Sequence, residues 1–181
     1  IADPSSRFGM EISVDTFRSE IVRRCYDTIG RFIVNDISAG EDDDEMLPTV
    51  GRLGLPYIAM HKRGNPRTMD SLCTYGDDIV EELKRYFKQF GQRAAEAGVE
   101  GWILDPGLGF AKSPAQCWEI LERLEELDMP GHPILIGAAD KRFTGGDNDR
   151  AHQIAALHGA AILRVHDVEG TRRCLESIGR F

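Results

Sequence analysis

The sequence predicts an α/β protein of the (β/α)8 barrel class. Short runs rich in β-branched residues alternate with longer amphipathic stretches, which is typical of strands joined by crossover helices. The short runs are almost continuously apolar, as expected for parallel strands buried on both faces. Each run also ends at a polar or reactive residue, and a barrel builds its active site from the C-terminal ends of several strands. An open doubly wound sheet would gather its chemistry at one switch point, and the chain has neither a GxGxxG nor a GxxxxGK[ST] motif.

Six strands and six helices are expected along the chain. The expected strands are Ile12–Thr16, Phe32–Ile37, Pro56–His61, Trp102–Asp105, Ile134–Gly137 and Ala161–His166. The expected helices are Phe17–Ile29, Met46–Leu53, Asp77–Ala97, Pro114–Leu127, Arg150–His158 and Glu169–Ile178. Gly98 stands where a C-terminal cap belongs, and Ser113-Pro114 forms a helix start.

The length of the chain bears on how much of a barrel it can form. It has 181 residues, whereas such barrels run to about 250. We therefore expect strands 3 to 8 to be recognisable and strands 1 and 2 to be missing or truncated. Residues 1–181 are predicted to form a single domain that is incomplete on its N-terminal side.

Composition and charge narrow the classes of function. The net charge of −8 argues against the basic surface of a nucleic-acid-binding protein. No apolar run approaches the roughly 18 residues of a membrane-spanning helix, and no signal peptide is visible. The four cysteines form no CxxC pair, which favours reduced thiols in a cytoplasmic protein over a disulfide framework or a zinc site. We expect small-molecule partners, without nucleic acid or membrane.

The polar residues at the predicted strand ends form two chemical groups. Asp15, Asn35 and Asp105 bring acceptors and an amide, which suit the edge of a nitrogen heterocycle. A second group is cationic and suits a phosphate or diphosphate, because an arginine fork matches its oxygens. This second group consists of Lys141, Arg164 and His166. Together the groups predict displacement of a diphosphate from a carbon attached to the heterocycle.

Each of these residues also has a purely structural interpretation. Asp15-Thr16 could cap the helix that follows, and Asn35-Asp36 could form a turn at the strand end. His61 could be a packed or hydrogen-bonded structural histidine. Asp105-Pro106-Gly107 could be only a turn, and Arg164 could pair with Asp167 or Glu169 on the surface. The acidic run Glu41–Glu45 is expected to be a solvated loop before a helix and not a metal site.

Five segments, in order along the chain, resemble dihydropteroate synthases. The first matches the family's third-strand signature, the second its Asn-Asp-Ile-Ser-Gly-Gly segment and the third its Met-His-x-Arg-Gly-x-Pro loop. The fourth resembles Asp-Pro-Gly-x-Gly-Phe-x-Lys, and the fifth matches the final strand. The five segments are Ile12–Thr16, Val34–Gly40, Met60–Pro66 with Thr68-Met69, Leu104–Lys112 and Arg164–Val168.

The resemblance implies a transferase of folate biosynthesis, in which p-aminobenzoate attacks the pterin methylene of dihydropterin pyrophosphate and pyrophosphate leaves with the help of Mg²⁺. It implies catalytic roles for Asp15, which would also stabilise positive charge on the pterin, and for Lys141. It implies a possible homodimer and assigns no metal ligand in this chain. Arg7 lies in the segment Ser5–Gly9, which is similar to the loop after the family's second strand. The implied substrate-binding residues are Asn35, Met60, Asp105, Phe110, Lys141, Arg164, His166 and Arg7.

One segment departs from the family pattern. The family's seventh-strand motif is Gly-x-Ser-Arg-Lys-Ser, and here only Gly137 and Lys141 are kept. Asp140 reverses a charge, Ala139 removes a hydroxyl, and Arg142 replaces a serine near the p-aminobenzoate carboxylate, which an arginine could itself bind. Two alternatives therefore stand beside the synthase. One is a pterin-binding relative that has lost p-aminobenzoate chemistry, and the other is a methyltetrahydrofolate-corrinoid methyltransferase. Sulfonamide sensitivity stays open.

Overall fold

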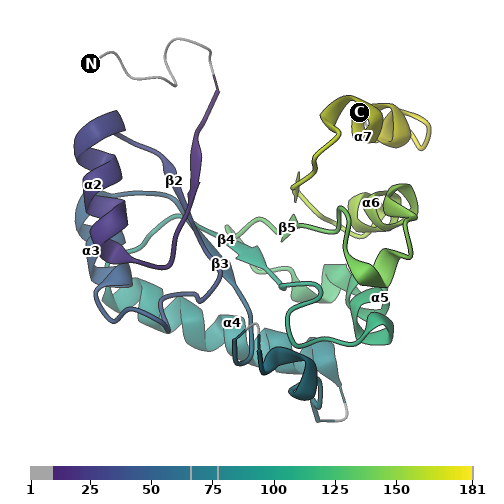
Figure 1. Cartoon of the computed structure of the whole chain (residues 1–181), viewed down its shortest axis with the longest axis horizontal. Coiled ribbons are helices and arrows are strands. Elements are labelled where there is room, and N and C mark those ends of the chain that lie inside the picture. The colour runs from purple at the N-terminus through teal and green to yellow at the C-terminus, as the bar shows by residue number, and fades with distance from the viewer. Residues whose placement is uncertain (1–9, 66, 77, 181) are drawn as a thin grey trace. The chain divides into compact units, whose positions relative to one another are not determined.

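A computed structural model describes residues 10–65, 67–76 and 78–180 (Figure 1). The chain divides into two compact units. The first comprises residues up to Met60 together with Phe87–Leu104, and the second comprises His61–Tyr86 and Asp105 onward. The single domain predicted for residues 1–181 stays a prediction.

The first unit contains a four-stranded sheet with the order β1-β2-β3-β4. Strands β1, β2 and β3 pair in parallel, so Asp15 lies opposite Asn35 and Asn35 opposite Ile58. Strands β2, β3 and β4 are largely buried, as expected for parallel strands covered on both faces, whereas Ser13 and Asp15 of β1 are exposed. The strands are β1 (Ser13–Asp15), β2 (Ile33–Asp36), β3 (Tyr57–Met60) and β4 (Trp102–Asp105).

Three helices accompany this sheet: α2 (Ser19–Ile29), α3 (Met46–Leu53) and the second half of α4 (Ile79–Glu96). Helices α2 and α3 are in contact and lie side by side in Figure 1. In the core, the ring of Phe90 stacks on Tyr57 at 5.9 Å and meets the edge of Trp102 at 4.9 Å between centroids. Gly51 permits the closest approach of α3 to the end of α4, because a Cβ there would overlap the carbonyl oxygen of Ala97.

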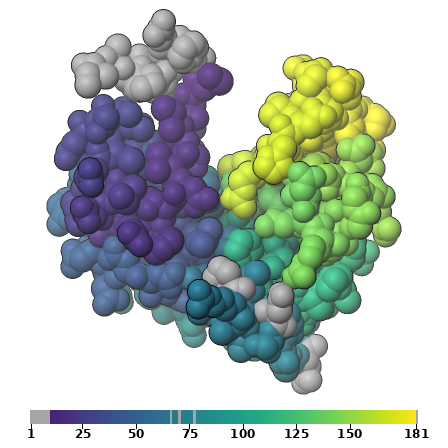
Figure 2. Space-filling view, in the orientation of Figure 1, coloured from purple at the N-terminus to yellow at the C-terminus, as the bar shows by residue number. Residues whose placement is uncertain are grey.

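The second unit contains the parallel pair β5 (Leu135–Ile136) and β6 (Ile162–Leu163). Its helices α5 (Pro114–Glu122) and α6 (Asn148–Leu157) pack together, and α6 also packs on α7 (Val168–Glu176). Their side chains form one continuous surface in the space-filling view (Figure 2). The unit also has three 3-10 turns: η1 (Met69–Ser71), η2 (Leu124–Leu127) and η3 (Arg142–Thr144).

Several helix ends follow the signals predicted from the sequence. Ser113 and Gln116 form a reciprocal capping box at the start of α5, with Pro114 at its first position. Gly98 has a φ of 74° after the end of α4, as a C-terminal cap requires. The acidic run is a loop, as predicted, and it has a further role: Asp43 Oδ2 accepts the backbone N–H of Ser19 at 2.7 Å, which caps α2 from another part of the chain.

Other boundaries differ from those predicted. Helix α2 begins at Ser19 and not at Phe17, so Asp15 does not cap it. The predicted helix Pro114–Leu127 breaks at Arg123, whose guanidinium is held by Asp78 and by Glu119 and Glu126. The predicted strand Ala161–His166 ends at Leu163, so that Arg164 and His166 lie beyond it. Asp77, the predicted start of α4, lies outside the described residues.

Two further expectations concern the chain as a whole. All four cysteines are free thiols, in agreement with the sequence prediction. Within the described ranges, no helix is both long enough and apolar enough to cross a membrane.

Candidate functional site

Asp15 and Asn35 lie next to each other at the ends of neighbouring strands. Their Cα atoms are register partners, and the backbone N–H of Thr16 donates to the carbonyl of Asn35 at 3.0 Å. Asp15 is exposed, whereas the side chain of Asn35 is largely buried. The structure therefore brings two of the three predicted heterocycle-binding residues together. Met60, a further predicted contact, ends β3 with its side chain buried.

Asp36 fixes the backbone that follows Asn35. Its fully buried carboxylate accepts four hydrogen bonds, from Tyr57 Oη at 2.6 Å, Ser38 N at 2.8 Å, Ser38 Oγ at 2.7 Å and Gly40 N at 2.9 Å. These bonds hold the loop in which Ala39 has a left-handed φ of 49°. The turn predicted as an alternative role for Asn35-Asp36 is therefore present, and it is built by Asp36.

Asp105, in the second unit, is a buried carboxylate with two partners. Its Oδ1 accepts the N–H of Gly107 at 2.8 Å, and its Oδ2 accepts Arg164 Nη2 at 3.1 Å. Burial raises the pKa of Asp105, and Arg164 opposes that rise. Arg164 forms an ion pair with Asp105, a partner that the surface interpretation of Arg164 did not include.

Lys141 lies against the ring of Phe110. Its Nζ is 4.7 Å from the ring centroid, a cation–π contact. Burial lowers the pKa of Lys141, and the nearby Arg164 lowers it further. The two side chains border a pocket of about 600 Å³ whose lining includes apolar groups and three cations. These are Met69, Cys73, Phe110, Pro114 and Phe143, with Lys112, Lys141 and Arg142, and the acidic residue Asp140 lines the same pocket.

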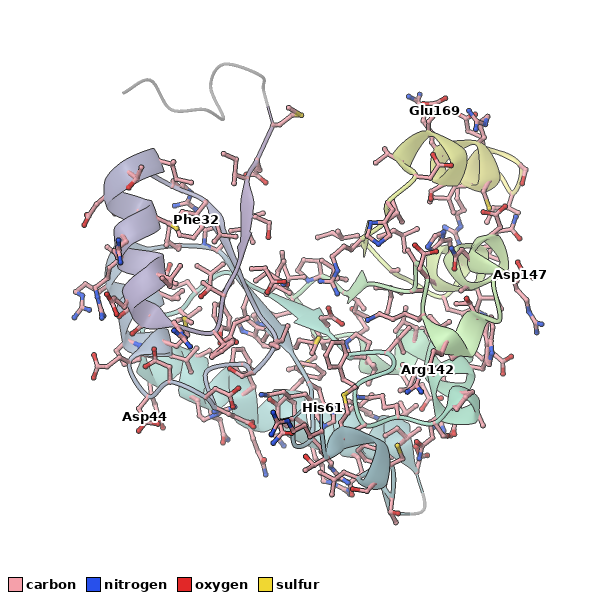
Figure 3. All side chains as sticks on the ribbon, in the orientation of Figure 1. Phe32, Asp44, His61, Arg142, Asp147 and Glu169 are labelled. Atoms are coloured by element: carbon pink, nitrogen blue, oxygen red, sulfur yellow. The ribbon has the colours of Figure 1, made fainter. Side chains whose placement is uncertain are left out.

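His61 and Lys112 form a buried pair that the sequence did not assign to the site. Lys112 Nζ lies 2.9 Å from His61 Nδ1, and the His61 ring meets Tyr86 edge-on at 4.6 Å between centroids. Figure 3 labels His61 on the ribbon. Burial and the neighbouring cations lower the pKa of His61 to about 2. The structural interpretation of His61 is therefore correct. The signal that could have identified Lys112 is its place at the end of the Leu104–Lys112 segment.

His166 is exposed and faces Asp140, with 3.8 Å between Nε2 and Oδ2. Asp140 has a left-handed φ of 56° and exchanges two hydrogen bonds with Asn148. Both Asp140 and His166 line a second pocket, of about 580 Å³, beside α6 and α7. The structure thus gives Arg164 and His166 different partners, and the sequence argument that both sit on one strand is wrong. Arg7 lies outside the described residues.

A metal site is not evident from the residues that the structure describes. No group of three or more His, Cys, Asp or Glu side chains among them could hold an ion.

Comparison with known proteins identifies the family. The family model "Pterin binding enzyme" matches residues 1–166. The folic acid synthesis protein fol1 of Pneumocystis carinii is 43% identical over 175 residues, covering 87% of this chain and 24% of that protein. The dihydropteroate synthase of Synechocystis sp. is 39% identical over 172 residues, covering 87% of this chain and 59% of the enzyme.

Solved structures give the same result. The dihydropteroate synthase of Thermus thermophilus in complex with 4-aminobenzoate superposes with a TM-score of 0.86 at 32% identity, covering 95% of this chain and 71% of that one. The same enzyme in complex with 6HMPPP gives a TM-score of 0.85 at 32% identity, covering 95% of this chain and 72% of that one.

The chain therefore belongs to the pterin binding enzyme family. Its named relatives are dihydropteroate synthases and folic acid synthesis proteins. The predicted fold class is confirmed: the chain is α/β with parallel strands and has the fold of part of a (β/α)8 barrel. It spans 24% and 59% of the length of the two curated relatives.

Proposed function

We propose that the protein is a dihydropteroate synthase, a transferase that condenses dihydropterin pyrophosphate with p-aminobenzoate and releases pyrophosphate. The observation that carries this proposal is the buried Asp105 carboxylate bonded to Arg164, in the same unit as an apolar pocket lined by cations. The family membership and the ligands of the Thermus thermophilus enzyme support it.

Asp105 keeps enough acceptor capacity to bind a heterocycle. A carboxylate has about four lone-pair positions, and Gly107 and Arg164 use one on each oxygen. The remaining positions suit the N–H groups on the edge of a pterin. Burial raises the pKa of Asp105, and Arg164 opposes that rise, which favours the ionised form that accepts hydrogen bonds. In the first unit, Asp15 and Asn35 are register partners and carry the same kinds of group, a carboxylate and an amide.

The cationic side chains suit the two anionic groups of the substrates, the carboxylate of p-aminobenzoate and the diphosphate of the pterin substrate. Lys141 and Arg142 line the pocket of about 600 Å³ together with the ring of Phe110. This combination suits a flat aromatic amine that carries a carboxylate, as p-aminobenzoate does. Charge stabilisation of the departing diphosphate by Arg164 and His166 would supply the main catalytic effect, and Asp15 would stabilise the cationic pterin.

Mg²⁺, the homodimer and a cytoplasmic location belong to this proposal. No residue of this chain is assigned as a ligand of the ion. Magnesium dependence is tested by titrating EDTA into the assay, and the dimer by light scattering.

A pterin-binding relative without synthase activity is the second candidate. Asp140 favours it, because its carboxylate faces His166 at 3.8 Å where the proposed leaving group is anionic. The two candidates are separated by measuring incorporation of labelled p-aminobenzoate into dihydropteroate with the full-length gene product. Turnover that requires dihydropterin pyrophosphate supports the synthase. Binding of the pterin without turnover supports the relative.

A further inference from the structure

The segment between β4 and α5 makes a tight turn with three left-handed residues. Gly107, Gly109 and Ala111 have φ values of 67°, 79° and 54°. Glycine adopts this conformation without cost, but an alanine there is strained by about 1 kcal/mol. Ala111 is also buried, so the surrounding atoms restrict any change in its backbone conformation. The neighbouring structure must hold this turn in place.

Lys112 is the side chain that links the turn to His61. Its Nζ is 3.1 Å from the carbonyl oxygen of Phe110, 2.9 Å from His61 Nδ1 and 3.5 Å from the carbonyl oxygen of His61. The amine is buried, and burial lowers its pKa to about 7. A buried amine with this many acceptors has a defined structural task, because an unpaired one would be costly.

His61 is itself held firmly, which makes it a suitable anchor. Its backbone N–H donates to the carbonyl of Asp105 at 3.0 Å, and its ring packs on Tyr86 and Tyr75. The Lys112 contacts therefore join the turn to a residue that is already fixed.

The turn carries one wall of the pocket of about 600 Å³ that we propose binds p-aminobenzoate, the acceptor substrate. We call it the acceptor pocket. Phe110 lies immediately before the strained residue, and Lys141 Nζ rests over its ring. The carbonyl of Phe110 is one of the Lys112 acceptors, so loss of the amine would release the residue that supports Lys141.

We propose that Lys112 is a positioning residue, which holds the Gly107–Ala111 turn against His61 so that Phe110 and Lys141 keep their places at the acceptor pocket. The inference rests on the proposed function for the identity of the acceptor. Its role is to position Phe110, whose carbonyl oxygen lies 3.1 Å from the Lys112 amine.

The test compares Lys112→Met with Lys88→Met in the full-length gene product. Methionine keeps the length and apolar stem of lysine and removes the three contacts, and Lys88 is an exposed lysine on α4. Lys112→Met should raise the KM for p-aminobenzoate about tenfold while kcat and the KM for dihydropterin pyrophosphate change much less. Lys88→Met should change none of these values.

A second variant separates positioning from general damage. Replacing Ala111 with glycine removes the strain that Lys112 opposes, so Ala111→Gly should recover part of the lost p-aminobenzoate affinity when added to Lys112→Met. Alone, Ala111→Gly should keep the wild-type KM. Equal rises in both KM values, or no recovery in the double variant, would contradict the proposal.

Hydrogen exchange tests the same inference without turnover. Amides of residues 107–112 should exchange faster in Lys112→Met than in wild type, and those of the other segments should not. Unchanged exchange in this segment would overturn the inference. A wild-type protein that makes no dihydropteroate would instead contradict the proposed function, and the exchange result would still decide the role of Lys112.

Discussion

Gly137 leaves the space in which the guanidinium of Arg164 lies. A Cβ on Gly137 would be 2.6 Å from Arg164 Nη2 and 3.0 Å from Nε. Because Arg164 donates to Asp105 from this position, a glycine at the end of β5 sets the geometry of a carboxylate on β4. A side chain larger than glycine at this position would therefore require Arg164 to move.

Gly137→Ala should displace Arg164 from Asp105 and leave the fold intact, since the atom that must move is the end of a flexible side chain. We expect affinity for dihydropterin pyrophosphate to fall by roughly tenfold or more, the equivalent of one lost charge-assisted hydrogen bond. Isothermal titration calorimetry measures this loss. The matched control is Gly101→Ala, whose Cβ would meet nothing within 4 Å. Equal affinities for the two variants would refute the role given to Gly137.

His61 should make stability fall with acidity. The pKa of His61 is about 2 in the folded protein, against 6.5 for a free imidazole, so the folded state holds it neutral. Stability is then fully present above pH 6.5 and is lost as pH falls toward 2. Between pH 6.5 and pH 5 the loss from this group is about 2 kcal/mol.

His61→Gln should reduce that pH dependence, because glutamine has no proton to take up. Urea unfolding at pH 5 and pH 7.5 measures the difference for both proteins. If the two proteins lose stability equally between these pH values, His61 is not the group responsible.

Asp140→Asn is a cleaner test of the altered motif than Asp140→Arg. Asparagine tolerates the left-handed φ of 56° and can keep the bonds to Asn148, whereas arginine would be strained there. Removing the charge should raise turnover several-fold if Asp140 repels the diphosphate. A steady-state assay of both variants measures the effect. Unchanged turnover in Asp140→Asn would mean that the sign of the charge is tolerated.

Ser113→Ala should destabilise the protein by about 1 kcal/mol through loss of the α5 cap. Gln116→Ala removes the other half of the capping box and a further bond to the carbonyl of Cys73 at 3.0 Å. The double variant should lose less than the sum of the two, because both residues share one motif. Thermal unfolding of the three variants checks this, and strict additivity would argue against the reciprocal cap.

The sequence predicted much of this molecule because its signals are local. Continuous apolar runs followed by Asp15 and Asp105 identified strands and strand ends, and Ser113-Pro114 identified a helix start. The break at Arg123 could not be predicted in the same way. It depends on Asp78, 45 residues earlier in the chain, and no local signal contains that pairing.

The role of Lys112 was hidden for a similar reason. Its direction depends on the left-handed conformation of Ala111, which alanine does not favour by itself and which only tertiary contacts can impose. The early end of β6 at Leu163 separated Arg164 from His166, although their spacing of one residue had suggested a common face.

Binding of dihydropterin pyrophosphate to wild type and to Asp105→Ala tests the central claim most directly. Isothermal titration calorimetry with the full-length gene product should show binding to wild type and none to the variant, while circular dichroism shows that both are folded. Undiminished affinity in a folded Asp105→Ala variant would contradict the assignment of this carboxylate to the pterin site.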